Sequence, residues 1–150
     1  MRRILPLTIL AIALTAGTVP AQAAPLKGAG LQLGWATDPA NAFLAGIHWQ
    51  ARPMGEELDL VPSLDFAFGG DVTMISPNLD AHYVLKTSSK LMPYIGAGVT
   101  FPWYDFEGGS EWQFGGALIG GVHLSPNMAF EAKYGLGDAP DWKFVFAVHK

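Results

Sequence analysis

The chain has 150 residues, of which 50% are apolar, 12% aromatic and only 15% charged, and it contains 18 glycines and no cysteine. Charged residues normally make up about a quarter of a soluble domain, so this composition is unusual for a water-soluble protein of this size. The lack of cysteine excludes a disulfide framework and a thiolate metal site, and 13 acidic against 9 basic residues exclude the basic surface that nucleic acid requires.

The first residues have the three parts of a secretory signal peptide. Arg2 and Arg3 precede an apolar stretch over residues 4–16, and the small-residue pattern Ala21-Gln22-Ala23 follows. The apolar stretch is shorter than the roughly 20 residues that a spanning helix needs. We therefore expect cleavage after Ala23, which leaves one mature domain, residues 24–150, exported to the envelope of a Gram-negative bacterium.

Beyond residue 23, bulky apolar residues alternate with small or polar ones in eight segments, separated by clusters of Gly, Pro, Asn, Asp and Ser. The predicted strands cover residues 28–36, 42–52, 58–69, 79–86, 91–101, 112–124, 128–136 and 142–149. None is a continuous apolar run of helix-spanning length, so the mature chain can enter a membrane only as a closed barrel. Pro62 and Pro93 are expected near strand ends or bulges.

The composition of the two strand faces separates a membrane barrel from a soluble sandwich. One face carries rows of Leu, Phe and Trp, whereas the other is mostly Gly, Ala, Ser and Thr with single charges between them. An eight-stranded barrel has an interior that side chains just fill, which suits the second face, and the first face then meets lipid. The predicted fold class is all-β, an eight-stranded antiparallel up-and-down transmembrane β-barrel.

The connections are expected to alternate between periplasmic turns and outside loops. The turns are residues 53–56, 87–90 and 125–127, and the outside loops are residues 37–41, 69–77, 102–111 and 137–141. Acidic residues in these loops are candidates for contact with an extracellular partner: Asp38, Asp71, Asp105, Glu107 and Glu111. Aromatic residues near the strand ends predict interfacial girdles: Trp35, Trp49, Trp103, Tyr104, Trp112, Tyr134 and Trp142.

The inward face of the predicted strands carries charges of both signs. The interior is expected to hold His48, Arg52, Asp59, Asp65, Asp80, His82, Lys86, Gln113, His123, Glu131, Lys133 and Lys143. Because buried charges must be paired, we predict a polar network rather than a water-filled ion or proton pathway. All four histidines fall on the inward parity, but they are expected at different heights and lack short ligand spacing, so neither metal nor cofactor is predicted.

The segments Leu91-Met-Pro-Tyr-Ile-Gly-Ala-Gly-Val99 and Gly120-Gly-Val-His-Leu-Ser-Pro-Asn-Met-Ala-Phe-Glu-Ala-Lys-Tyr134 resemble the second half of the small outer-membrane β-barrel families. These families include the opacity-type porins and the transmembrane domain of outer-membrane protein A. In them, a Pro-Tyr-Gly-Gly strand precedes a Ser-Pro-Asn hairpin, and the next strand carries an inward acidic residue. The resemblance implies a monomer in outer-membrane lipid, placed there by the outer-membrane insertion machinery.

We predict a non-enzymatic integral outer-membrane protein with a structural or adhesive role and loop-mediated recognition. One alternative is a barrel enzyme, because His123-Leu-Ser125 is similar to the His-x-Ser of lipid A deacylases, with Glu131 as the available acid. Against it, His123 and Ser125 point inward near a periplasmic turn, whereas lipid A acyl chains lie in the outer leaflet. The other alternative is a soluble periplasmic lipocalin-like carrier of an apolar ligand, which requires the aromatic face to point inward.

Overall fold

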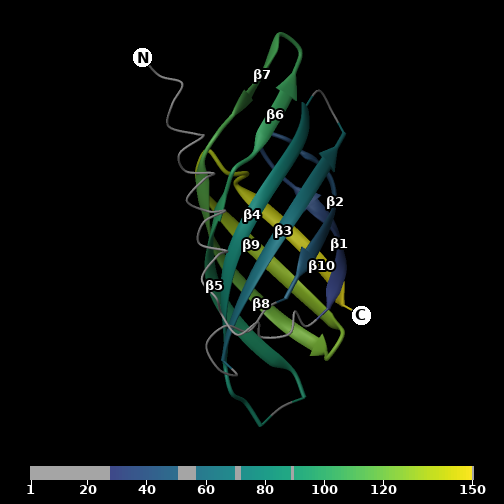
Figure 1. Cartoon of the computed structure of the whole chain (residues 1–150), viewed down its shortest axis with the longest axis vertical. Coiled ribbons are helices and arrows are strands. Elements are labelled where there is room, and N and C mark those ends of the chain that lie inside the picture. The colour runs from purple at the N-terminus through teal and green to yellow at the C-terminus, as the bar shows by residue number, and fades with distance from the viewer. Residues whose placement is uncertain (1–27, 51–56, 70–71, 89, 150) are drawn as a thin grey trace, which may run out of the picture.

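The computed structural model describes residues 28–50, 57–69, 72–88 and 90–149 (Figure 1). Among these residues, no helix is long and apolar enough to cross a membrane. They form ten strands: β1 (Ala29–Ala36), β2 (Ala42–Trp49), β3 (Leu58–Phe68), β4 (Val72–Val84), β5 (Met92–Thr100), β6 (Trp103–Phe106), β7 (Gly109–Trp112), β8 (Gly115–Ser125), β9 (Met128–Gly137) and β10 (Trp142–His149).

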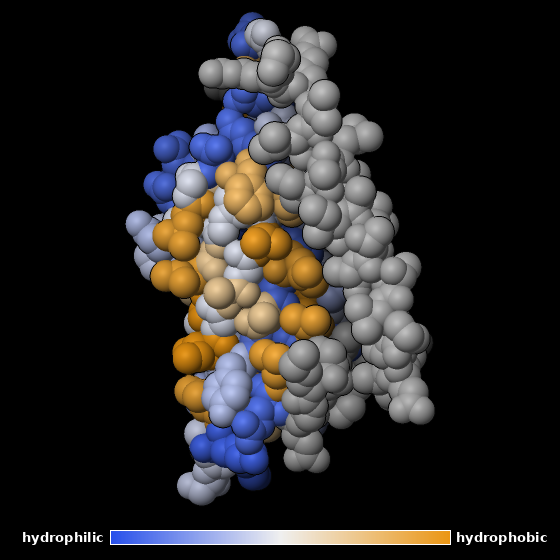
Figure 2. All heavy atoms as spheres, turned by 60° about the vertical axis from the view of Figure 1, so that its left-hand side comes forward, coloured by the Kyte–Doolittle hydropathy of each residue, from blue (hydrophilic) through white to orange (hydrophobic). Residues whose placement is uncertain are grey.

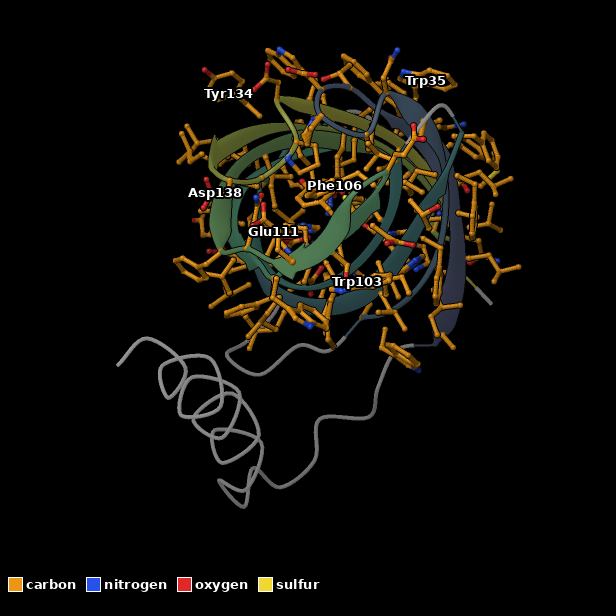
Figure 3. All side chains as sticks on the ribbon, turned by 90° about the horizontal axis from the view of Figure 1, so that it is seen from above. Trp35, Trp103, Phe106, Glu111, Tyr134 and Asp138 are labelled. Carbon is orange, nitrogen blue, oxygen red and sulfur yellow. The ribbon has the colours of Figure 1, made fainter. Side chains whose placement is uncertain are left out.

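Eight of the ten strands close into a barrel. Each pairs antiparallel with the next one in the order β1, β2, β3, β4, β5, β8, β9, β10, and β10 pairs back onto β1. Seen from above, the ribbons form a closed ring (Figure 3). The predicted eight-stranded antiparallel up-and-down barrel is thus confirmed, whereas the predicted signal peptide and the turn at residues 53–56 lie outside the described residues.

The two ends of the barrel differ, and we name them by what they carry. β1 begins and β10 ends at the same end, here called the terminal end, where Gly30 pairs with His149. The opposite end, here called the loop end, carries the β6–β7 hairpin, which continues upward beyond the barrel wall (Figure 1). The hairpin replaces most of the long loop that was predicted at residues 102–111, because Glu107 and Gly108 form the tight turn between its strands.

The loop predicted at residues 69–77 is also shorter than expected. β4 already begins at Val72, and residues 72–78 continue the alternation of the strand, with Met74, Ser76 and Asn78 buried. Pro77 does not disrupt the sheet, because β4 changes its neighbour around this residue. Asn78–Val84 pair with β5, and Val72–Ile75 pair with β6. The missing donor of Pro77 therefore falls in a gap of the ladder.

Two other prolines were expected at strand ends or bulges. Pro93 is the second residue of β5, as expected. Pro62 is instead the fifth residue of β3, so that expectation was wrong for this residue. It lies one residue past the last β2–β3 pair, His48 with Ser63, and among the described residues its ladder partner is Leu79 of β4.

The barrel is apolar outside and polar inside. Along β3, buried Asp59, Ser63 and Asp65 alternate with the more exposed Leu60 and Leu64. On the face shown in Figure 2, hydrophobic side chains form a belt across the middle, and hydrophilic ones gather toward both ends. The face with the smaller side chains therefore lines the interior, as the alternation predicts.

The interior becomes apolar at the loop end. Tyr104 of β6 is 2% exposed and packs with Ala42, Ala67 and Met74, and its hydroxyl donates to the carbonyl of Asp138 at 3.2 Å. Leu44, an apolar residue on the inward face of β2, is fully buried in a second cluster with Ala36 and Val145. These side chains close the interior at that end.

Candidate functional site

The polar side chains of the interior are the candidate functional site. Those buried on the strands include nine of the residues predicted for the interior: His48, Asp59, Asp65, Asp80, His82, His123, Glu131, Lys133 and Lys143. They come from six different strands, so the site exists only when the barrel closes.

The half of the interior toward the loop end is centred on Asp65. Its carboxylate accepts hydrogen bonds from Gln32 Nε2, from Asn78 Nδ2 at 3.0 Å and from Lys143 Nζ at 3.0 Å. Asn78 Oδ1 in turn accepts from Thr100 Oγ1 at 2.7 Å. Asp65 is fully buried, and these donors stabilise its charge.

Lys133 links two carboxylates near the middle of the barrel. Its Nζ lies 2.5 Å from Asp80 Oδ2 and 3.0 Å from Glu131 Oε1, and the residue is 5% exposed. Gly98, across from Asp80 on β5, leaves room for this carboxylate, because a Cβ there would overlap Asp80 Oδ1. Removal of the lysine would leave two buried carboxylates without their cation.

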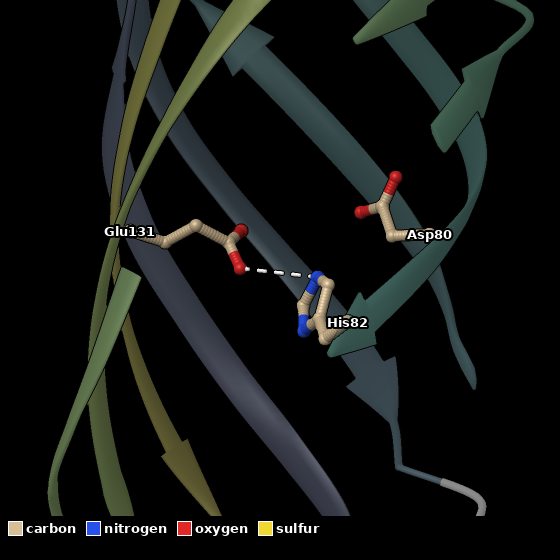
Figure 4. A group of neighbouring side chains, drawn as sticks. All are labelled: Asp80, His82 and Glu131. Atoms are coloured by element: carbon tan, nitrogen blue, oxygen red, sulfur yellow. Dashed lines mark ion pairs between the residues drawn. The ribbon is translucent and has the colours of Figure 1, made fainter. Parts of the chain in front are cut away.

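Tyr94 holds the other oxygen of Glu131. Its hydroxyl donates to Glu131 Oε2 at 2.9 Å, and its ring stacks on His82 with centroids 4.7 Å apart. Gly121 provides the space, since a Cβ there would overlap the Tyr94 ring. His82 Nε2 lies 3.4 Å from the same Glu131 oxygen, and Asp80 stands beside the pair (Figure 4).

The four histidines form a chain of rings toward the terminal end. Beyond Tyr94, the centroid of His123 is 4.9 Å away, that of His149 a further 6.5 Å, and His48 meets His149 at 4.5 Å with Nε2 and Nδ1 2.8 Å apart. The four rings, which were expected at different heights, thus form one connected group around a common cavity. Strands of a tilted barrel are staggered, so residues at different positions along their strands can come close together.

A small cavity lies among these rings. It has a volume of about 20 Å³ and is lined by Gln32, His48, Gln50, Val61, His82, Tyr94, His123, Ala129, Glu131, Lys133, Ala147 and His149. A second cavity of about 10 Å³ lies nearer the loop end, beside Asp80 and Lys143. One water needs roughly 10–15 Å³, so neither cavity is a water-filled channel.

Two residues predicted for the interior lie elsewhere. Lys86 lies two residues past Val84, the end of β4, extends into solvent at the terminal end and pairs with Glu57 at 2.5 Å. Gln113 lies between β7 and β8 at the loop end, where its amide donates to Glu111 at 2.5 Å. Both were assigned by parity along predicted strands that are longer than the observed ones, since β4 ends at Val84 and β8 begins at Gly115. Arg52 lies outside the described residues.

Most of the predicted girdle aromatics lie on the outer surface. Trp35, Tyr134 and Trp142 are 42–45% exposed near the loop end, and Tyr134 contacts Trp142 with centroids 5.1 Å apart. Trp35 and Tyr134 stand on the perimeter of the ring in Figure 3. Trp112 is 61% exposed, and Trp49 and Trp103 are half-buried. Tyr104 was wrongly assigned, because β6 turns it into the barrel mouth instead of toward the outer surface.

The three residues of the enzyme alternative serve other contacts. The oxygens of Glu131 accept from Lys133 and Tyr94, and one of them also faces His82. Ser125 lies at an irregularity at the end of β8, and its Oγ accepts from the backbone N–H of Asn127 in the turn. The described geometry therefore does not favour a relay from Glu131 through His123 to Ser125.

Sequence reasoning missed several polar residues of the interior. Gln32, Gln50, Ser63, Ser76, Asn78 and Thr100 all line it or bond within it. His149 was predicted on the inward face but was not included in the predicted network. Ser76 was assigned to the predicted loop at residues 69–77, and Asn78 fell between that loop and the predicted strand at residues 79–86, because Ser-Pro-Asn is a common turn sequence. The others stand on the inward parity of their strands, so the same alternation could have found them.

Comparisons with known proteins give limited likenesses. No family model matches the chain, and no curated protein matches it. Two solved structures are similar: Neisserial surface protein A, with 17% identity over 81% of this chain and 94% of the other and a TM-score of 0.48, and Ail, the attachment invasion locus protein of Yersinia pestis, with 17% identity over 83% and 99% and a TM-score of 0.39. The fold assignment rests on the strand pairing of this chain.

Proposed function

We propose that this chain is a monomeric integral outer-membrane β-barrel with a structural or adhesive role and no catalytic activity. The observation that carries the proposal is the outer surface. Leu31, Leu33, Ile95, Leu118 and Phe130 are 44–66% exposed, and they belong to four different barrel strands. A continuous apolar belt of this kind is costly in water and suits hydrocarbon.

The length of the strands supports a membrane-spanning orientation. β3 and β8 each have 11 residues. At about 3.3 Å per residue and a tilt of about 40°, such a strand rises roughly 28 Å along the barrel axis. The apolar band of outer-membrane barrels is about 25 Å tall, so these strands match the hydrocarbon thickness.

The interior argues against the soluble carrier. A lipocalin-like protein needs an apolar cavity large enough for its ligand, several hundred Å³ for a small molecule. Here the cavity among the histidines has about 20 Å³, and its surroundings include Glu131 and Lys133. The ion pairs and hydrogen bonds of the interior instead suit a role in holding the barrel closed.

The β6–β7 hairpin supports the adhesive part of the proposal. It extends the wall at the loop end, and its exposed residues combine acidic Asp105, Glu107 and Glu111 with the apolar Phe106 and Trp112. Aromatic side chains are enriched among the residues that dominate binding at protein interfaces. We propose that this hairpin contacts an extracellular partner.

Fractionation of the expressing cells tests the membrane assignment. The mature chain is expected in the outer membrane, with a gel migration that changes on boiling, because a closed barrel resists unfolding by the detergent of the gel. Full recovery in the soluble periplasmic fraction would contradict the proposal and support the carrier.

A pair of matched substitutions tests the depth of the belt. Leu33→Arg, at a 52% exposed position in the middle of β1, is expected to destabilise the folded barrel in lipid by about 2–4 kcal/mol. Leu91→Arg, 47% exposed next to the start of β5 at the terminal end, is expected to cost about 0–1 kcal/mol. Urea titration of both variants in vesicles measures this. In a water-soluble barrel both would be nearly neutral, about 0.5 kcal/mol or less.

A further inference from the structure

Two histidines connect three strands at the terminal end of the barrel. His48 lies on β2 and His149 on β10, and both pair with Gly30 of β1, which runs between them. Their rings meet edge to face, with His48 Nε2 and His149 Nδ1 2.8 Å apart. A side-chain hydrogen bond therefore joins the second strand to the last strand, across the seam where the first and last strands of the barrel meet.

Gly30 leaves room for this contact. A Cβ at that position would overlap the His48 ring, so any larger residue would push the two rings apart. At the loop end of the same strand, Ala36 pairs with Ala42 and Lys143, and the alanine side chains there cannot form such a bond. The two ends of β1 are therefore closed by different means, and only the terminal end depends on imidazole chemistry.

The hydrogen bond between two neutral imidazoles uses a single proton. One ring donates its N–H, and the other accepts with its lone pair. The outer nitrogens, His48 Nδ1 and His149 Nε2, are buried and have no hydrogen-bond partner. A first added proton binds at the outer nitrogen of the donor ring, which has a free lone pair, and leaves the bond in place. A second proton has to bind at the nitrogen that accepts the bond, so two N–H groups then face each other and the bond is lost.

Charged and titratable groups from the surrounding strands act on this pair. Those that the structure describes around it are Asp59 and Asp65 of β3, His82 of β4, Tyr94 of β5, His123 of β8, and Glu131 and Lys133 of β9. The carboxylates attract protons to the pair, whereas Lys133 and a charged His82 repel them. A single positive charge on the pair is therefore tolerated, but two imidazolium rings in contact repel each other.

We propose that the His48–His149 pair, here called the histidine clasp, is a pH-sensitive lock on the terminal end of the barrel. At neutral pH its hydrogen bond holds β2, β1 and β10 together. In acid the doubly protonated rings separate, and the half-buried ring of His149, at the end of β10, turns toward solvent. The pairing of β1 with β10 then loosens at this end only, and water enters the cavity of about 20 Å³ beside Glu131.

Hydrogen exchange of the backbone amides, followed by NMR on the mature barrel in detergent micelles, tests the clasp. Exchange is compared at about pH 7.5 and about pH 4.5, a range in which an ordinary imidazole takes up its proton, after correction for the intrinsic pH dependence of exchange. Protection of the β1 amides next to Gly30 is expected to fall at least about tenfold in acid. Protection next to Ala36, at the loop end of the same strand, is expected to stay unchanged. No bilayer is needed, so the result is independent of the membrane assignment.

Two glutamine variants separate the clasp from a merely structural contact, with barrel closure checked by migration before and after boiling. In His149→Gln the amide oxygen accepts a hydrogen bond from protonated His48 but takes up no proton, so protection next to Gly30 is expected to persist in acid. His123→Gln is the matched control, because His123 lines the same cavity outside the pair, and it is expected to keep the acid response of the wild type. Equal protection of the wild type at both pH values would overturn the proposal, and so would an undiminished acid response in His149→Gln.

Discussion

Replacement of Lys133 by methionine tests whether the interior is held by its ion pairs. Methionine has nearly the same length but no charge, so Asp80 and Glu131 lose the ammonium that lies 2.5 Å and 3.0 Å from their oxygens. At an effective dielectric constant of about 20, these distances correspond to gross attractions of about 7 and about 6 kcal/mol, which the desolvation of the three charges largely offsets. Removal of one partner of a buried ion pair costs about 3–5 kcal/mol, and we expect that loss here.

Equilibrium unfolding by urea in lipid vesicles, followed by the fluorescence of the 5 tryptophans, measures the loss. The double variant Asp80→Asn with Lys133→Met is expected to lose less than the sum of the two single variants, because Asp80→Asn removes a carboxylate that Lys133→Met alone would leave unpaired. A loss under about 1 kcal/mol for Lys133→Met, with an unchanged dependence on urea, would refute the reasoning. The interior charges would then be solvated rather than paired.

Two other predictions follow from particular contacts. Gly121→Ala is expected to destabilise the barrel by about 1–3 kcal/mol in the same urea titration, because its Cβ would overlap the Tyr94 ring. Gly120→Ala is the control and should be close to neutral, since a Cβ there meets nothing within 4 Å. Equal effects of the two substitutions would contradict this packing. At the rim, the hydrogen bond from Lys86 lowers the pKa of Glu57 below its ordinary value, so its small contribution to stability is present above that value and is lost as the pH falls through the lowered pKa. Carboxyl NMR titration of wild type and Lys86→Ala should show a higher Glu57 pKa in the variant, and identical curves would exclude the contact.

The alternation of the sequence predicted the barrel well because its cause is local. Successive side chains of a strand point to opposite faces whatever the strand pairs with, so the inward positions of Asp59, Asp65 and Glu131 could be assigned without knowledge of register. The same rule failed for Lys86, which stands past the end of its strand. The alternation predicts which face of a strand a residue lies on, but it does not predict where the strand ends.

The contacts across the barrel could not be predicted in this way. Lys143 and Asp65 are 78 residues apart, and Lys133 and Asp80 are 53 apart, and each pair meets only because of the stagger of eight strands around the ring. The cluster of four histidines depends on the same stagger. At Pro77 a local sequence signal gave the wrong prediction. The sequence around it is typical of turns, yet β4 continues through it, because neither β5 nor β6 pairs with Pro77.

β4 takes part both in the barrel wall and in the pairing of the β6–β7 hairpin, through different residues. The wall and the hairpin can therefore change in sequence independently. Residues Asn78–Val84 of this strand pair with β5 in the wall, and residues Val72–Ile75 pair with β6 in the projecting hairpin. Closure of the barrel therefore does not depend on the hairpin tip. At that tip, side chains added at Gly108 or Gly109 would meet no neighbour within 4 Å. Foreign peptide epitopes inserted there would be displayed above the barrel without disturbing its closure, and natural lineages are free to diversify the same few residues under selection by whatever the exposed tip encounters.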